Sequence, residues 1–161
     1  MDHLHISIYV LGLLVLLALV FDFMNGFHDA ANAIATVVST GVLKPQTAVA
    51  MSALFNFVAI FTVGVHVAAT VGKGTIDPSI IDHYVIFGAL CGAISWNLIT
   101  WGLGIPSSSS HALVGGLLGA GISKAGLSAV VWNGVFMTSA AIVVSPAIGL
   151  LLALMLVLVI S

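Results

Sequence analysis

Charged side chains are scarce in this sequence. Asp, Glu, Lys and Arg together make up 5% of the 161 residues, whereas about a quarter of an ordinary soluble domain is charged. Hydrophobic residues make up 61%, and the mean hydropathy is +1.28. A chain with so little polar surface could not stay dissolved in water, so we expect an integral membrane protein.

Arginine and glutamate are absent, and the basic residues are three lysines. Binding to nucleic acid needs clustered cations that neutralise phosphates, so the composition excludes it. Cys91 is the single cysteine and cannot form a disulfide within the chain. The N-terminus lacks the basic residues of a signal peptide, because Asp2, His3 and His5 precede the first apolar run. We therefore expect that run to be retained as a membrane span.

Apolar runs of membrane-spanning length, about 20 residues, are abundant. Runs of this order predict helices over residues 6–24, 46–71, 84–103 and 127–160, and shorter apolar runs predict helices over residues 30–43 and 111–122. The last run is too long for one simple crossing, so we expect Pro146 to kink it or to divide it into two helices. These features predict a single all-α transmembrane domain over residues 1–161, with three or four full spans.

Two interruptions between these runs carry polar side chains at membrane depth. One lies at residues 25–29 and the other at residues 104–110, and a short helix rich in Ala or Gly follows each. Irregular backbone inside a membrane is tolerated only where protein buries it or where it lines a watery cavity. Paired broken or re-entrant helices are typical of the binding site of a transporter.

The first interruption belongs to the segment NGFHDAAN. If a half-helix begins near Asp29, Asp29 and Asn32 share one face of it. A carboxylate and an amide oxygen suit a hard cation, and the carboxylate alone could take a proton. The alternative is that Asp29 merely caps a helix, but a cap does not need Asn25, His28 and Asn32 beside it. An ionisable residue inside a membrane indicates a functional site by default.

The second interruption is GIPSSSSHALVGG. Pro106 suits the first turn of a helix, where its missing N–H would be unpaired in any case. The hydroxyls of residues 107–110 then lie beside unpaired backbone N–H groups, an arrangement that attracts an oxyanion without Arg or Lys. The alternative is a serine-rich cap or loop. Asn56 and Asn97 lie in the middle of spans, where we expect a structural hydrogen bond between helices.

At these two motifs the chain resembles the inorganic phosphate transporter family of Pit-type symporters. The resemblance is carried by NGFHDAANAIATVVSTGVL and GIPSSSSHALVGGLLGAGI, and extends to WNLITWGLGIP and SAAIVVSPAIGLLLA. It implies symport of phosphate across the membrane with H⁺ or Na⁺, including transport as a neutral metal–phosphate complex. It implies no resident cofactor or metal and no catalytic residue. Residue chemistry alone does not separate phosphate from sulfate, so that choice depends on the resemblance.

The resemblance also implies roles for individual residues. Gly26, Asp29 and Asn32 match the first family motif, while His28 stands where many members have Asn. The implied phosphate ligands are Asp29, Ser108, Ser109 and Ser110. The implied ligands of the coupling ion are Asp29, Asn32 and Asn25. His28 or His111 could relay protons, because histidine titrates near neutral pH.

Family members carry each motif twice, in two inverted halves, whereas this chain carries one copy of each. It is similar to an N-terminal half, and three explanations are open: a truncated gene, a half-transporter that pairs with another chain, or a homodimer of opposed topologies. The expected location is the bacterial inner membrane. Two rival functions are a non-transporting membrane subunit and an intramembrane serine hydrolase that uses Ser110, His111 and Asp29. Adjacent helical residues do not face each other, which argues against the hydrolase.

Overall fold

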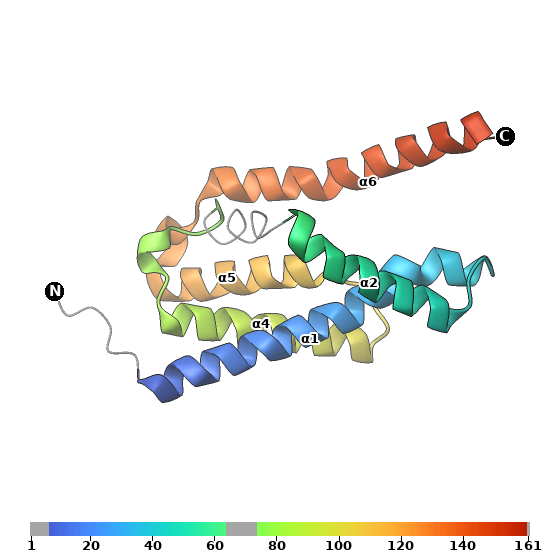
Figure 1. The fold of residues 1–161 in the computed structure, drawn as a ribbon. Coiled ribbons are helices and arrows are strands. Elements are labelled where there is room, and N and C mark those ends of the chain that lie inside the picture. The colour runs from blue at the N-terminus through green and yellow to red at the C-terminus, as the bar shows by residue number, and fades with distance from the viewer. Residues whose placement is uncertain (1–6, 64–73, 161) are drawn as a thin grey trace.

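The computed structural model describes residues 7–63 and 74–160 (Figure 1). Five of its helices are long and apolar enough to cross a membrane. In chain order the elements are α1 (Ile8–Ser39), α2 (Pro45–Val63), η1 (Pro78–Ile80), α4 (His83–Gly102), α5 (Ser109–Ala125), η2 (Gly126–Ala129) and α6 (Trp132–Ile160). The expected all-α membrane fold is therefore confirmed, and the helices predicted over residues 84–103 and 111–122 correspond to α4 and α5. Residues 64–71 of the predicted second span, including His66, lie outside the described part.

The predicted interruption at residues 25–29 is wrong, because α1 runs without a break from Ile8 to Ser39. A helix satisfies its own backbone N–H and C=O groups even in lipid, so polar side chains do not break it. The helix ends instead at Thr40 and Gly41, where Gly41 has φ +73° and Val42 N–H donates to Val37 O at 3.1 Å. This left-handed glycine cap is a Schellman motif.

The predicted break after residue 103 is confirmed. Gly104, with φ +66°, closes a second Schellman motif in which Ile105 N–H donates to Thr100 O at 2.8 Å. Pro106, however, is not in the first turn of the next helix, because the N-cap of α5 is Ser108. Chain reversal at this connection makes α4 and α5 an antiparallel hairpin (Figure 1).

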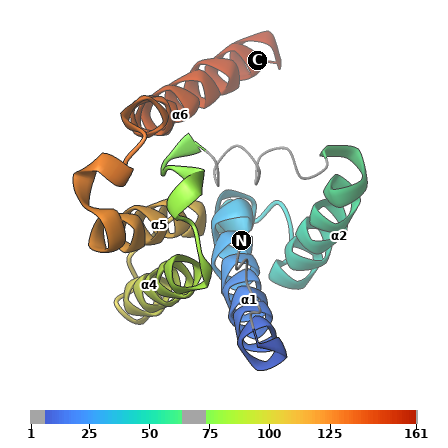
Figure 2. The same ribbon diagram turned by 90° about the vertical axis from the view of Figure 1, so that its left-hand side faces the viewer.

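The helices α1, α4 and α5 pack against one another and form the described core (Figure 2). α4 and α5 approach so closely that a Cβ on Gly116 would lie 2.4 Å from the carbonyl oxygen of Ala89. Small residues allow such backbone contact between membrane helices. The core where the three helices meet contains Phe21, Leu90, Ala93 and Ala112. α2 packs mainly on α1, beside the three-helix core (Figure 2).

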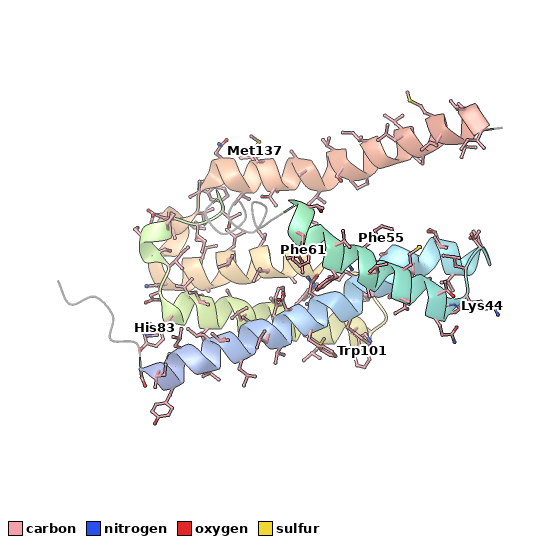
Figure 3. The ribbon with its side chains drawn as sticks, in the orientation of Figure 1. Lys44, Phe55, Phe61, His83, Trp101 and Met137 are labelled. Carbon is pink, nitrogen blue, oxygen red and sulfur yellow. The ribbon has the colours of Figure 1, made fainter. Side chains whose placement is uncertain are left out.

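The helix α6 lies apart from this three-helix core (Figure 2) and contains no buried residue along its length, 132–160. Most of its large apolar side chains are exposed, among them that of Met137 (Figure 3). Pro146 lies inside one helix, so of the two expectations for this residue, a kink or a division into two helices, the division is wrong. Near its start, Gly134, Val135 and Thr138 are partly covered, and the rest of this apolar helix is suited to contact with lipid or with another membrane chain.

Candidate functional site

The side chain of Ser109 joins the two motifs in space. Ser109 is the first residue of α5 and is fully buried. Its hydroxyl donates to Oδ1 of Asn25 and lies 3.2 Å from Oδ2 of Asp29. Asn25 and Asp29 are four residues apart on α1 and therefore share the face that meets α5. Two segments 80 and 84 residues apart in the sequence thus form one polar cluster.

This cluster consists of oxygen atoms. A serine hydroxyl has one hydrogen and can donate it to only one acceptor at a time. When the carboxylate is ionised, only one hydrogen atom is therefore available to the three oxygen atoms that meet here. They are Asn25 Oδ1, Asp29 Oδ2 and Ser109 Oγ. Carboxylate, amide and hydroxyl oxygens are ligands of hard cations. The arrangement can accept a cation or a proton.

The four consecutive serines have four different environments. Ser107 accepts a hydrogen bond from Nε1 of Trp96 at 3.2 Å, and Ser108 caps α5 by accepting from His111 N–H at 3.4 Å. Ser109 enters the polar cluster, whereas Ser110 is exposed. Successive residues of a helix point in directions about 100° apart, so neighbouring serines face different surroundings. The sequence shows four identical residues and therefore does not indicate which of them is buried.

Asn32 is not part of the polar cluster. It is exposed, although the sequence placed it on one face with Asp29. The α1 helix continues past the ends of α4 and α5 (Figure 1), so its last turns have fewer neighbours. The partners of Asp29 are instead Asn25 on its own helix face and Ser109 opposite.

The two histidines proposed as proton relays lie in different environments. His28 is 9% exposed, and its Nε2 atom has no hydrogen-bond partner among the described residues. The ring of the neighbouring Phe27 meets Trp101 of α4 edge-on, at 5.7 Å between centroids. His111 is exposed and lies on α5. Nothing in the geometry joins the two histidines into one relay.

A groove of about 960 Å³ runs along α4 and α5. Its lining residues include Trp96, Ser107, Ser108, His111, Gly115 and Gly119. The buried Ser109 is not among its lining residues, nor are Asn25 and Asp29 of α1. Three of the sequence-predicted site residues therefore meet between α1 and α5, where Ser109 is buried and Asn25 and Asp29 are half-buried. Ser108 and His111 line the groove.

An ion pair lies at the other end of the α4–α5 hairpin. Lys124 Nζ is 2.7 Å from Asp82 Oδ2 and also donates to Ile80 O at 2.8 Å. Asp82 caps α4 by accepting from the N–H groups of Tyr84 and Val85. The Lys124 ammonium beside Asp82 lowers the pKa of that carboxyl, and the bond from Val85 N–H lowers it further. This pair fastens the ends of two helices and makes no contact with the polar cluster.

The rival serine hydrolase is not supported by the side-chain pairing. Asp29 accepts a hydrogen bond from Ser109, whereas Ser110 is exposed.

Within residues 7–63 and 74–160, no three His, Cys, Asp or Glu side chains are grouped so that they could hold a metal ion.

Asn97 of α4 has a more unusual environment than its sequence context predicts. It is fully buried on α4, and neither atom of its amide group has a partner in the described ranges. The expected hydrogen bond between helices is therefore not seen. Asn56, given the same structural role, is exposed on α2.

Comparison with known proteins places the polar cluster in context. Residues 25–161 of this chain match a protein-family model described as "Phosphate transporter family". A probable low-affinity inorganic phosphate transporter of Rhizobium meliloti is 61% identical over 148 residues, which cover 92% of this chain and 44% of that protein. A probable low-affinity inorganic phosphate transporter of Bacillus subtilis is 49% identical over 146 residues. The matched region covers 89% of this chain and 44% of that protein.

A solved structure shares the fold as well. It is titled "The sodium-dependent phosphate transporter", and it superposes with a TM-score of 0.88 at 28% sequence identity. The match covers 96% of this chain and 40% of that one. The chain thus spans less than half the length of these relatives. Five apolar helices of spanning length, together with these matches, identify an integral membrane protein.

Proposed function

The chain belongs to the phosphate transporter family, and from this premise we propose that it forms one half of a symporter that carries inorganic phosphate across the bacterial inner membrane. The observation that carries the proposal is the contact of Ser109 with Asn25 and Asp29. It brings both polar motifs to one point in the helix core. The names of the relatives supply the substrate, since hydroxyl and amide groups would serve sulfate equally well.

The proposed phosphate site is the start of α5. The first backbone N–H groups of a helix have no partner within it, and the helix dipole favours an anion there. Ser108, Ser109 and Ser110 surround this helix end, and Asp29 is bonded to the middle one. Because Asp29 is itself negative when ionised, phosphate binding beside it needs a bound cation or a proton on the carboxylate. That requirement is a physical basis for coupling phosphate to H⁺ or Na⁺.

The proposed coupling-ion ligands are Asp29 and Asn25, with Asn32 added only if the helix end is covered by another chain. His28, buried beside Asp29, remains the better placed of the two candidate proton relays, since His111 is exposed. Transport as a metal–phosphate complex would place the metal in the substrate rather than in a resident site.

A second half is part of the proposal. The curated relatives are more than twice as long as the matched region. The exposed apolar surface of α6 offers an area for another chain or for lipid. Whether the second half is a separate chain or an inverted copy of this one is open. The alternative function is a truncated or non-transporting membrane subunit.

The test is a chimera in which this chain replaces the matched region of the Rhizobium meliloti relative. We expect the chimera in proteoliposomes to accumulate radiolabelled phosphate when a cation gradient is applied, and we expect Asp29→Asn to abolish this coupled uptake. Asp22→Asn is the matched control, because Asp22 is an exposed carboxylate on the same helix. Uptake by Asp29→Asn at the unmodified level would contradict the assigned role. An inactive chimera beside an active parent would favour the non-transporting alternative.

A further inference from the structure

Two hydrogen bonds hold the connection between α4 and α5 on the last turns of α4. The first is made by the backbone, where Ile105 N–H donates to Thr100 O at 2.8 Å. The second is made by side chains, where the indole N–H of Trp96 donates to Ser107 Oγ at 3.2 Å. Between the two lies Pro106, which has no N–H to donate. The segment after Pro106 therefore depends on the side-chain bond.

No backbone hydrogen bond takes the place of the bond from Trp96. In residues 7–63 and 74–160, the N–H groups of Ser107 and Ser108 make no backbone hydrogen bond. The next backbone bond along the chain already belongs to α5, where Ala112 N–H donates to Ser108 O at 3.0 Å. Among the described residues, Trp96 is thus the one residue of α4 that holds the segment 106–108 by a hydrogen bond.

The environment of Trp96 distinguishes its ring from its N–H group. About half of the residue is exposed, as is usual for a tryptophan that faces lipid or the membrane interface. It also lines the groove beside Ser107 and Ser108. An indole N–H away from water needs an acceptor, and Ser107 Oγ is that acceptor. The ring alone would serve as a membrane anchor, whereas the N–H group is specific to the contact with Ser107.

The position of Ser107 affects the position of Ser109, which is two residues further along the chain. Ser108 lies between them and is the N-cap of α5. Ser109 contacts Asn25 and Asp29 on α1 only while the start of α5 stays in place. Hydrogen bonds weaken steeply as their distance and angle depart from the preferred values. A small displacement of Ser107 would therefore disturb that contact, and it would move the unpaired N–H groups at the start of α5 as well.

We propose that Trp96 is a positioning residue of the transport site. Its indole N–H, through Ser107, holds the start of α5 where Ser108 and Ser109 can bind phosphate. The inference rests on the proposed function for its purpose, and it assigns Trp96 no contact with the substrate. It requires the N–H group of Trp96, whereas a role as a membrane anchor would require only the ring.

The variant that separates these roles is Trp96→Phe, which removes the N–H group and keeps an aromatic ring. The matched control is Trp101→Phe, at a tryptophan of the same helix that is exposed to a similar extent. The contact of Trp101 with Phe27 is made by the ring, so phenylalanine can preserve it.

The first measurement is amide hydrogen exchange of the purified full chain in detergent, without phosphate. We expect Trp96→Phe to speed exchange about fivefold in peptides that cover residues 107–114, because loss of the bond lets the start of α5 open more often. Exchange in α1 and α6 should stay at the wild-type rate. Trp101→Phe should leave the rates in residues 107–114 unchanged.

The second measurement is phosphate uptake by the chimera. We expect Trp96→Phe to raise the KM for phosphate about fivefold and to keep the maximal rate, as loss of uniform binding would. Ser107→Ala should have the same effect. The double variant should be no worse than either single one, because both substitutions remove the same hydrogen bond.

Four results would overturn the inference. Trp96→Phe with wild-type exchange in residues 107–114, or with a wild-type KM in an active chimera, would show that the bond does not position the site. Faster exchange throughout the chain would make Trp96 a residue of general stability, and an equal effect of Trp101→Phe would assign both tryptophans to membrane anchoring. Additive effects of Trp96→Phe and Ser107→Ala would show that the two side chains act separately. The exchange measurement needs no transport, so a chimera that carries no phosphate would contradict the proposed function alone.

Discussion

At Ser109 one hydroxyl group connects two helices that are distant in the sequence. Its neighbours Ser108 and Ser110 carry the same side chain, yet one caps α5 and the other is exposed. The difference arises from the rotation of the helix, which directs one side chain in this turn toward α1. At the residue scale, function therefore depends on direction as much as on chemistry.

Substitution of Ser109 by alanine tests this distinction. Ser109→Ala leaves Asn25 Oδ1 and Asp29 facing a methyl group, so we expect a stability loss of about 1 kcal/mol. We also expect phosphate uptake by the chimera to fall by roughly tenfold, as loss of about 1.4 kcal/mol of binding free energy would produce.

The control for this prediction is Ser110→Ala, which removes an exposed hydroxyl one residue away. Equal effects of the two substitutions on uptake would show that the serine run acts as a whole and that burial of Ser109 has no special role.

At the element scale, the α4–α5 hairpin is positioned by glycine. A Cβ at Gly116 would lie 2.4 Å from the carbonyl oxygen of Ala89, and that oxygen cannot move without distortion of α4. The hairpin in turn determines where Ser109 and Asn97 lie relative to α1. Close backbone packing of α4 and α5 is therefore a condition for the polar cluster, although Gly116 lies outside that cluster.

Gly116→Ala is expected to destabilise the chain by about 1–3 kcal/mol, the usual cost of adding an atom to a filled space. The measurement is the melting temperature in detergent. Gly115→Ala is the matched control, because a Cβ there meets nothing within 4 Å. A Gly116→Ala protein as stable as Gly115→Ala would mean that α4 and α5 are less closely packed in the membrane.

At the scale of the whole molecule, the helices have a defined sidedness. Lys44 and His83 lie toward opposite ends of the bundle (Figure 3), before α2 and at the start of α4. Since lysine is so rare in the chain, charge provides little bias toward one orientation. The orientation of the chain in the membrane therefore distinguishes two forms of the half-transporter. A chain that pairs with a different chain has one orientation, whereas a chain that pairs with an inverted copy of itself has both.

We expect single cysteines at Lys44 and at Ser79, in a Cys91→Ala background, to be labelled from opposite sides of the membrane by an impermeant maleimide in intact cells and inverted vesicles. Ser79 is exposed in η1, close to the start of α4. Labelling of each position from one side only would indicate that all copies of the chain have the same orientation. Labelling of both positions from both sides would instead indicate an inverted homodimer.

Membrane residence, the helical class and the break between α4 and α5 were determined by the sequence alone, because apolar length and the Gly104–Pro106 turn act locally. The α1 helix runs through Asp29 on its own backbone hydrogen bonds, which are local. What tertiary structure decided is the partner of the Asp29 carboxylate, which is Ser109 on α5. The same holds for the choice of Ser109 among four serines and for the burial of Asn97. Each depends on which helix lies opposite, and no local pattern in the chain contains that information.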